Sequence, residues 1–459
     1  MLAVLSLTLS ASSAVGGPDG RWTRVTDNGL GNIDQVALAR DAGGVLNVVW
    51  PLKTGGTVAF RAARIARNGA TIGVPATVTD GWRSVNNSAL VVQPDGSLRL
   101  LFAGIHASQP SFSVGRATSA TAPADGSSWT WTSQFHTDAV GVSEYAGSFG
   151  AATALDGTPV FSWGAHVKVG LDPAVPDQLL VDGCCTYDSD VAVDGATGEV
   201  LVVWYSNIAA NYGTWARVVS PALGALVHAP GSARVDLKAA IPNSQRVAVT
   251  GRIGAPGIYL AYGSGYGTVV PTVANWRPGA QRILFWQYGG VDTPRVLTNR
   301  RGTRVMLSPG PNAKIWVAWV GKKNVIQAMR SSSDLRRFGA LVTVSPPAGT
   351  STLWKLAGDG AAGPLDVVAI VKTPSGTAGW HRQLLPGLTV LPQGRAPGVA
   401  FIVTDAGEPV AGATVTVAGR TARTGATGVT RRFDLPASRE YRVARAAKPG
   451  YTDGTILFR

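Results

Sequence analysis

Glutamate, lysine and cysteine are all scarce in this chain of 459 residues. The 27 acidic residues comprise four Glu and 23 Asp, and the 41 basic residues comprise nine Lys and 32 Arg. Glu and Lys favour helix interiors, whereas Asp favours turns. Together with 57 Gly and 28 Pro, this composition excludes a largely helical protein and indicates a turn-rich β protein.

Long apolar runs are also missing, because no segment approaches the roughly 18 apolar residues that a membrane-spanning helix requires. Residues 1–9 form a short apolar stretch, and the small residues Ser12, Ser13 and Ala14 follow it. This pattern predicts a secretory signal over residues 1–14 and a mature protein that is secreted or held at the cell surface. Two alternatives stay open: an apolar N-terminal strand, and a true start upstream, since no basic residue precedes the stretch.

The formal net charge of +14 comes from basic residues that are scattered along the chain in runs no longer than two. A strong positive charge suits an acidic glycan, a nucleic acid or an anionic surface as partner. Since the chain carries no nucleic-acid-binding motif, we expect a generally basic surface and no nucleic-acid partner.

One pattern recurs along most of the chain: an apolar strand, an Asp/Gly turn and a second strand that ends in a large apolar residue. Its seven copies end at residues 50, 102, 163, 204, 262, 319 and 370, between 41 and 61 residues apart. This spacing accommodates a four-stranded antiparallel blade and predicts an all-β protein with a β-propeller over residues 21–385. Seven blades are expected, with six as the alternative because the last copy is degenerate. The aromatic residues that end the copies are predicted to lie in the core: Trp50, Trp163, Trp204 and Trp319.

The pattern changes near residue 397 to short alternating strands bounded by Gly, Pro and Asp. Residues 407–415 read G-E-P-V-A-G-A-T-V, and residues 448–451 read K-P-G-Y. Through these motifs, residues 397–459 resemble the carboxypeptidase-regulatory-like domain. The resemblance implies a small transthyretin-like β-sandwich without chemistry of its own. Residues 386–396, which are rich in Pro and Gly, are predicted to be a linker.

The turn at residues 332–338, S-S-D-L-R-R-F, is similar to a degenerate Asp box, whose usual form is S-x-D-x-G-x-T-W. Residues 124–129 carry a second, shorter version. With the blade pattern, these turns make residues 21–385 resemble the sialidase superfamily. The resemblance implies three arginines around a substrate carboxylate, a Tyr nucleophile paired with a Glu, and an Asp as acid and base.

Several of these catalytic roles have no matching residue. The family's F/Y-R-I-P motif is absent, because the nearest string at residues 60–63 is F-R-A-A. Glu144 is the one candidate for the catalytic Glu, and its neighbour Tyr145 would point to the opposite face of a strand. We therefore expect a carbohydrate-binding or adhesion protein without sialidase activity, and we keep a glycoside hydrolase as the alternative.

The two cysteines are adjacent, at Cys184 and Cys185. In an exported protein they are predicted to form a vicinal disulfide. Such a ring either only stiffens the turn or presents a rigid plate on which a sugar stacks beside Tyr187 and Asp188. A calcium site is a further option, although alternating Asp residues more often only form turns. No other cofactor is expected; the protein is expected to be a monomer whose partner is an extracellular glycan or a cell-surface polymer. The calcium ligands would be Asp182, Asp188 and Asp190.

Overall fold

Strands make up almost all of the regular structure in the computed structural model. One short 3-10 helix, η1 (Lys322–Asn324), is the only helical segment within the described residues, and none of these residues forms a helix long and apolar enough to cross a membrane. The expected all-β class is confirmed. The described residues are 20–26, 36–107, 116–123, 126–137, 149–164, 166–172, 174–181, 186–206, 212–232, 246–264, 282–298, 302–374, 376–395, 397–436 and 440–459.

The first two four-stranded units share one long strand, β5, so that they form a single seven-stranded sheet. The first part of β5 pairs with β4 and the second part with β6, with irregular pairing between the two parts. β5 is therefore the outer strand of the first unit and the inner strand of the second. The strands of this sheet are β2 (Ala37–Arg40), β3 (Leu46–Thr54), β4 (Thr57–Ile65), β5 (Thr71–Val92), β6 (Leu98–His106), β7 (Arg116–Ala122) and β8 (Thr130–Thr137).

The next four units are separate antiparallel sheets whose strands pair in chain order. Each begins with an inner strand and proceeds outward. They are β9 (Phe149–Thr153), β10 (Pro159–Trp163), β11 (His166–Val169) and β12 (Gln178–Leu179); β13 (Thr186–Val193), β14 (Val200–Ser206), β15 (Gly213–Ser220) and β16 (Val227–His228); β17 (Val247–Arg252), β18 (Ala255–Ser264), β19 (Arg282–Gln287) and β20 (Arg295–Thr298); and β21 (Thr303–Pro309), β22 (Ile315–Val320), β23 (Ile326–Arg330) and β24 (Val342–Val344).

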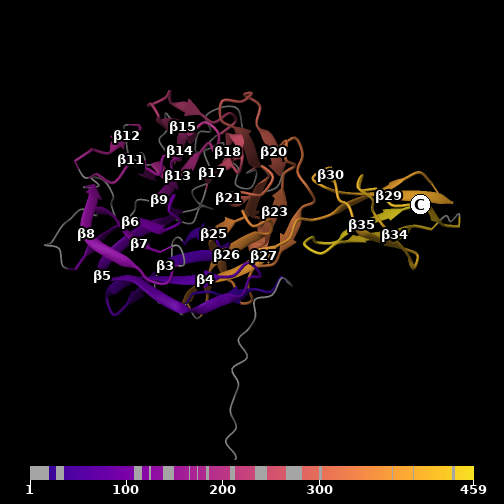
Figure 1. Cartoon of the computed structure of the whole chain (residues 1–459), viewed down its shortest axis with the longest axis horizontal. Coiled ribbons are helices and arrows are strands. Elements are labelled where there is room, and N and C mark those ends of the chain that lie inside the picture. The colour runs from indigo at the N-terminus through magenta and orange to yellow at the C-terminus, as the bar shows by residue number, and fades with distance from the viewer. Residues whose placement is uncertain are drawn as a thin grey trace, which may run out of the picture.

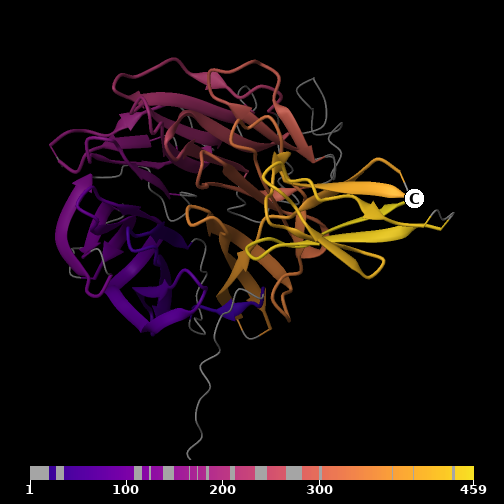
Figure 2. The same cartoon turned by 45° about the vertical axis from the view of Figure 1, so that its right-hand side comes forward.

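The last unit contains strands from both ends of the propeller. β25 (Thr352–Asp359), β26 (Leu365–Thr373) and β27 (Gly376–Leu384) are joined by β1 (Thr23–Arg24), which pairs with β27. Each inner strand contacts the inner strand of the next unit, and β25 contacts β2. The described strands thus form a closed ring of seven four-stranded units, a β-propeller (Figure 1, Figure 2).

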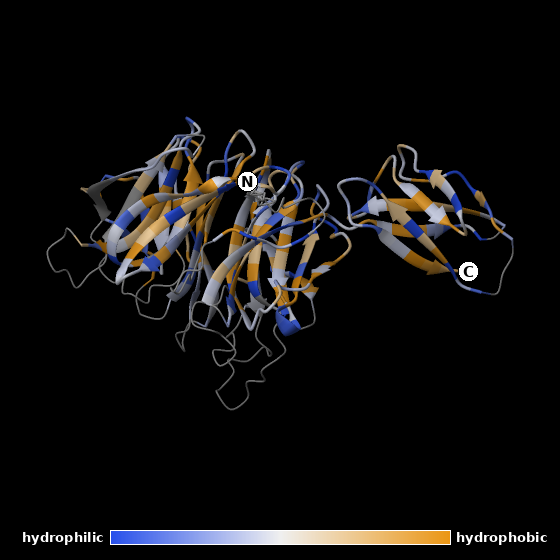
Figure 3. Ribbon diagram, turned by 90° about the horizontal axis from the view of Figure 1, so that it is seen from below, coloured by the Kyte–Doolittle hydropathy of each residue, from blue (hydrophilic) through white to orange (hydrophobic). Residues whose placement is uncertain are grey.

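The tryptophans that were expected in the core lie there, with at most 2% of each residue exposed. Trp204 packs against Val160 and Val167 of the preceding unit, and Trp319 packs against Ile283 in the same way. Both faces of a propeller blade are covered by its neighbours, so strands such as β22 are buried along their whole length. Hydrophobic residues accordingly recur along the propeller strands (Figure 3). The prediction that these tryptophans lie in the core is confirmed.

The C-terminal residues form two sheets packed face to face, seen at the right of Figure 1. Their inner faces enclose a core that includes Phe401, Val415 and Leu435. One sheet contains β28 (Thr389–Gln393), β29 (Gly398–Asp405), β30 (Glu408–Pro409) and β33 (Phe433–Asp434), and the other contains β32 (Arg420–Arg423), β31 (Thr414–Val417), β34 (Arg442–Ala447) and β35 (Gly454–Phe458).

The predicted linker 386–396 differs from the structure, because its central residues 389–393 form strand β28 of the sandwich. β28 pairs with β29 over all five of its residues, and Leu388 and Val390 are buried in the sandwich core. The alternation of Val390 inward and Leu391 outward is a strand signal that the surrounding Pro and Gly residues concealed. The connection between the two domains is therefore shorter than expected, from Leu384 to Thr389.

The sandwich is held against the sixth unit by buried ion pairs. The Asp405 carboxylate accepts a hydrogen bond from Lys314 Nζ at 3.0 Å and another from Arg330 Nη2. Glu408 lies 2.6 Å from Lys314 Nζ and accepts the backbone N–H of Ser333 at 2.6 Å. Because Lys314, Arg330 and Asp405 are all buried, these contacts join the two domains in a water-poor interface.

The turn predicted at residues 332–338 forms this docking point. Ser332 Oγ donates to Asp334 Oδ1 at 2.6 Å, and the backbone N–H of Arg336 donates to the same oxygen at 3.0 Å. Hydrogen bonds of this kind fix a tight turn. The turn connects β23 with β24 and supports the sandwich through Ser333, so its observed role is structural.

Candidate functional site

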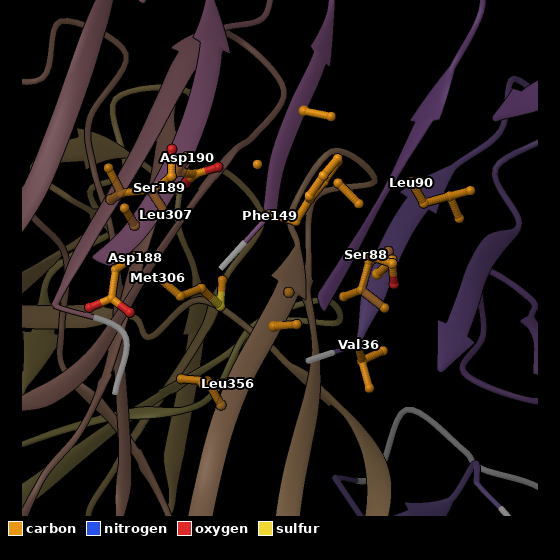
Figure 4. Close-up of a pocket in the computed structure, with 18 of the residues that line it drawn as sticks. Val36, Ser88, Leu90, Phe149, Asp188, Ser189, Asp190, Met306, Leu307 and Leu356 are labelled. Atoms are coloured by element: carbon orange, nitrogen blue, oxygen red, sulfur yellow. The ribbon is translucent and has the colours of Figure 1, made fainter. Parts of the chain in front are cut away.

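The inner strands of all seven units surround a central cavity of about 210 Å³ (Figure 4). Most of its lining is small or apolar, with Leu90, Phe149 and Met306 among the larger side chains. β13 supplies the main polar wall. In Figure 4, Asp188 and Asp190 lie on one side of the cavity and Ser88 of β5 lies on the other.

The volume of the cavity limits what can enter it. Pockets that enclose small molecules usually measure about 300–1,000 Å³, whereas one water molecule takes about 30 Å³. At about 210 Å³ the cavity has room for several waters or a small ion. A larger ligand would therefore have to bind at one end of this central channel.

The backbone is irregular at one end of this channel. Four inner strands, β5, β13, β21 and β25, change pairing register just before the residues that line the cavity. Register shifts of this kind redirect side chains and are frequent next to functional sites. Two non-glycine residues at these shifts, Asp188 and Arg304, have left-handed backbone with φ of 55° and 52°. We call this region the bulged end of the channel.

Asp188 and Arg246 form a buried ion pair at the bulged end. Arg246 Nη1 donates to Asp188 Oδ2 at 2.7 Å, and the Arg246 backbone N–H donates to the same oxygen at 3.1 Å. The guanidinium carbon lies 4.8 Å from the ring centroid of Tyr205 and 5.4 Å from that of Tyr187. A carboxylate and two aromatic rings thus fix the position of this cation.

Two further cationic residues occupy similar places on the next two inner strands. Arg246 directly precedes Val247, Arg304 precedes Val305, and Lys355 precedes Leu356, and the second residue of each pair lines the cavity. All three cationic residues are buried, and Arg304 Nε donates to the Trp354 carbonyl at 2.7 Å. Buried charges act through a lower effective dielectric than surface charges. Their common placement favours the binding of an anionic group at the bulged end.

Asp190 connects β13 to β17. One of its oxygens accepts the Val191 N–H at 2.9 Å, and the other accepts the Val249 N–H at 3.2 Å. Burial raises the pKa of the Asp190 carboxyl to about 6, although these two N–H groups act in the opposite direction. Asp194 makes a similar connection by accepting the Gly257 N–H at 2.7 Å. These aspartates bridge neighbouring units whose inner strands belong to separate sheets.

The described residues do not bring the expected calcium ligands together. Asp188 faces Arg246, and both oxygens of Asp190 face backbone N–H groups. Calcium requires six to eight oxygen ligands. Within the part of the chain that the structure describes, no group of three or more His, Cys, Asp or Glu side chains is placed to hold a metal ion.

The expected sugar-binding residues are only partly placed. Tyr187 and Asp188 do lie together, next to Arg246. Sequence reasoning missed Arg246, which is 58 positions from Asp188. A signal was available, because an arginine directly precedes the first apolar residue of the inner strand in two consecutive repeats: Arg246 precedes Val247 and Arg304 precedes Val305. The remaining expected residues, Glu144, Asp182, Cys184 and Cys185, lie outside the described residues.

The raised pKa of Asp190 predicts that this residue opposes folding at neutral pH. Its pKa is about 6 in the fold against 3.8 ordinarily, so the cost is about 3 kcal/mol at pH 7 and nearly half of it is recovered by pH 5. The free energy of unfolding of the wild type should therefore rise on acidification relative to that of Asp190→Asn. Urea titrations at pH 7, 6 and 5 measure the difference, and parallel pH curves for the two proteins would contradict it.

A matched control is Asp95→Asn. Asp95 is fully exposed, and hydrogen bonds from Ser97 lower the pKa of its carboxyl. A carboxyl with a lowered pKa stabilises the fold above its unfolded pKa and loses this effect as the pH falls. Its removal should therefore change the pH dependence in the direction opposite to Asp190→Asn.

Comparisons with known proteins show similarity in structure only. No protein-family model matches the chain, and no curated protein matches its sequence. Solved structures similar to it include the SapL1 lectin in complex with alpha methyl fucoside, with a TM-score of 0.41, 15% identity and coverage of 70% of this chain and 99% of the lectin. The Penicillium chrysogenum alpha-L-arabinanase complexed with arabinobiose has a TM-score of 0.43, 11% identity and coverage of 80% and 97%. A Trypanosoma rangeli sialidase mutant that displays trans-sialidase activity has a TM-score of 0.43, 9% identity and coverage of 97% and 87%.

Proposed function

We propose that this protein is a secreted or cell-surface carbohydrate-binding protein whose propeller binds acidic sugars at the bulged end of its channel. The observation that carries the proposal is the position of Arg246, held between Asp188 and the rings of Tyr187 and Tyr205. Guanidinium groups suit carboxylate recognition because their donors are fixed in one plane. A cation that is already oriented loses little conformational entropy when it binds a ligand.

Arg304 and Lys355 extend the cationic character of this end over the next two units. Tyr187 is only partly buried, so its ring offers an apolar surface for a sugar face. The arrangement thus combines positive charge with one stacking surface. The C-terminal sandwich would then serve as the spacer or adhesion unit that its resemblance implies.

Binding of an acidic oligosaccharide tests the proposal. We expect an array of acidic and neutral glycans to show preference for the acidic ones, and Arg304→Gln to weaken that binding at least tenfold. The magnitude corresponds to the loss of one hydrogen bond to a charged group, about 1.5–3 kcal/mol. Arg336→Gln is the matched control, because Arg336 is exposed on the turn at the sandwich interface. Equal weakening by both variants, or no glycan binding, would refute the site.

A glycoside hydrolase is the second candidate, favoured by the two carboxylates in one cavity. Burial raises the pKa of Asp190 as a general acid requires, while Asp188 is paired with a cation. Both oxygens of Asp190 already accept backbone N–H groups, from Val191 and Val249, which is why binding is preferred here. Release of reducing sugar from the bound glycan that disappears in Asp190→Asn would establish the hydrolase, and binding without release would support the lectin-like function.

A further inference from the structure

The sandwich has one sheet face that nothing in the described chain covers. In the sheet β32–β31–β34–β35, Val415, Ala444 and Phe458 point into the core, so their strand neighbours point outward. Val443 and Leu457 on this outer face are 55% and 65% exposed. We call this surface the outer face of the sandwich; its residues are Thr414, Thr416, Thr421, Arg423, Val443, Arg445, Ala447, Thr455 and Leu457.

The polar side chains of the outer face are aligned in rows across the strands. Thr421 pairs with Thr416, Thr416 with Arg445, and Arg445 with Thr455, so one row crosses all four strands. Side chains directly opposite one another in such a row are about 5 Å apart. A second row joins Arg423 to Thr414. Hydroxyl and guanidinium groups therefore lie at regular intervals along a line that an extended chain can follow.

A groove of about 350 Å³ runs along this surface. Its lining includes Thr414, Thr416, Val443 and Arg445, which belong to β31 and β34. Its apolar margin gives contact area, while the threonines and Arg445 supply hydrogen-bond partners. Beyond one end of the sheet, Tyr441 is 61% exposed with the guanidinium of Arg459 4.0 Å above its ring.

The surface of the sandwich carries more basic than acidic residues. Residues 397–459 contain nine Lys and Arg residues and five Asp and Glu residues. Two of the five acidic residues, Asp405 and Glu408, form ion pairs with Lys314 of the propeller. A third, Asp453, pairs with Arg445. The surface of the sandwich therefore carries an excess of positive charge, to which Arg423 contributes on the outer face.

We infer that the outer face of the sandwich is a second binding site, for a polyanionic polysaccharide. Regular hydroxyl and guanidinium rows on a flat sheet suit a chain with repeated hydroxyl and acidic groups, and the groove accommodates its rings. The site lies on a different domain from the bulged end of the channel, so the two sites are independent. Two binding sites on one chain increase the apparent affinity for a polymer that reaches both.

The test uses the full-length protein and two probes, heparin as a sulfated chain and polygalacturonate as a carboxylated one. Arg423→Gln/Arg445→Gln should weaken binding at 0.1 M salt at least tenfold. The matched control, Arg431→Gln/Arg432→Gln, removes the same charge from exposed positions of the same domain outside the outer face and should change binding less than twofold. Thr416→Asp should also weaken binding, because it places a negative charge in the middle of the row.

Each outcome decides the inference. Equal weakening by the two double variants would mean that only net charge matters and would overturn the site. Duplex DNA or anionic vesicles that compete as well as heparin would overturn the polysaccharide class. If Arg304→Gln abolished binding and the outer-face variants did not, the polymer would bind the propeller alone. This result would overturn the outer-face site and leave the proposed function supported. Unchanged melting temperatures ensure that lost binding is not unfolding.

Discussion

Replacing Asp405 with Ala should destabilise the protein by about 3–5 kcal/mol, the usual cost of removing one partner from a buried ion pair. Asp405 is 3% exposed at its side chain and contacts two cations of the propeller, Lys314 and Arg330, which are each 9% exposed. Without the carboxylate, both cations stay buried with less compensation. Because undocking would return them to water, we expect the variant to unfold in two calorimetric transitions, one for each domain, and the wild type to unfold in a single coupled transition.

Asp453→Ala is the matched control for this experiment. Asp453 also pairs with an arginine of the sandwich, Arg445, but that arginine is 66% exposed at its side chain. Exposed ion pairs contribute about 1 kcal/mol or less. If Asp405→Ala melted like Asp453→Ala, the buried pairs would not hold the domains together.

Replacing Arg40 with Met should open the ring of the propeller at its closure. Arg40 on β2 donates through Nε to Asp359 Oδ1 at 2.5 Å and through Nη2 to Asp366 Oδ2 at 2.5 Å, and both acids belong to the last unit. His381 completes the network with Nε2 at 2.8 Å from Asp366 Oδ1. The substitution leaves two buried carboxylates close together, and we expect a loss of about 3–5 kcal/mol at neutral pH.

The loss should shrink as the pH falls. Burial already raises the pKa of Asp359, and Arg40 acts against this effect. Without Arg40 the pKa of the carboxyl rises further, so acidification neutralises it and relieves the repulsion between the two acids. Chemical unfolding at pH 7.5 and pH 5 measures the gap between variant and wild type, with the exposed Arg336→Met as control. A gap that stayed constant with pH would exclude carboxylate repulsion as its cause.

The class of the fold and much of its core could be predicted from the amino-acid sequence. Apolar alternation and turn residues are local signals, and a repeat multiplies them, so the β propeller and the burial of Trp204 and Trp319 could be predicted. The same local logic placed strands after residue 397. The prediction was wrong at β28, where neighbouring Pro and Gly residues indicated a linker. Leu388 and Val390 are instead buried in the sandwich core.

Which distant residues come into contact could not be predicted, because it depends on how the strands are arranged in the folded protein. β1 joins β27 because a ring must close between its first and last units, and no local pattern encodes that pairing. Arg246 meets Asp188 across 58 positions, and Asp405 meets Lys314 across 91. The sequence contains 32 scattered arginines but does not show which of them become buried or form ion pairs. Desolvation and pairing depend on which strands become neighbours. The core could thus be predicted from periodicity, whereas the candidate site and the domain interface depend on long-range electrostatics that only the folded ring creates.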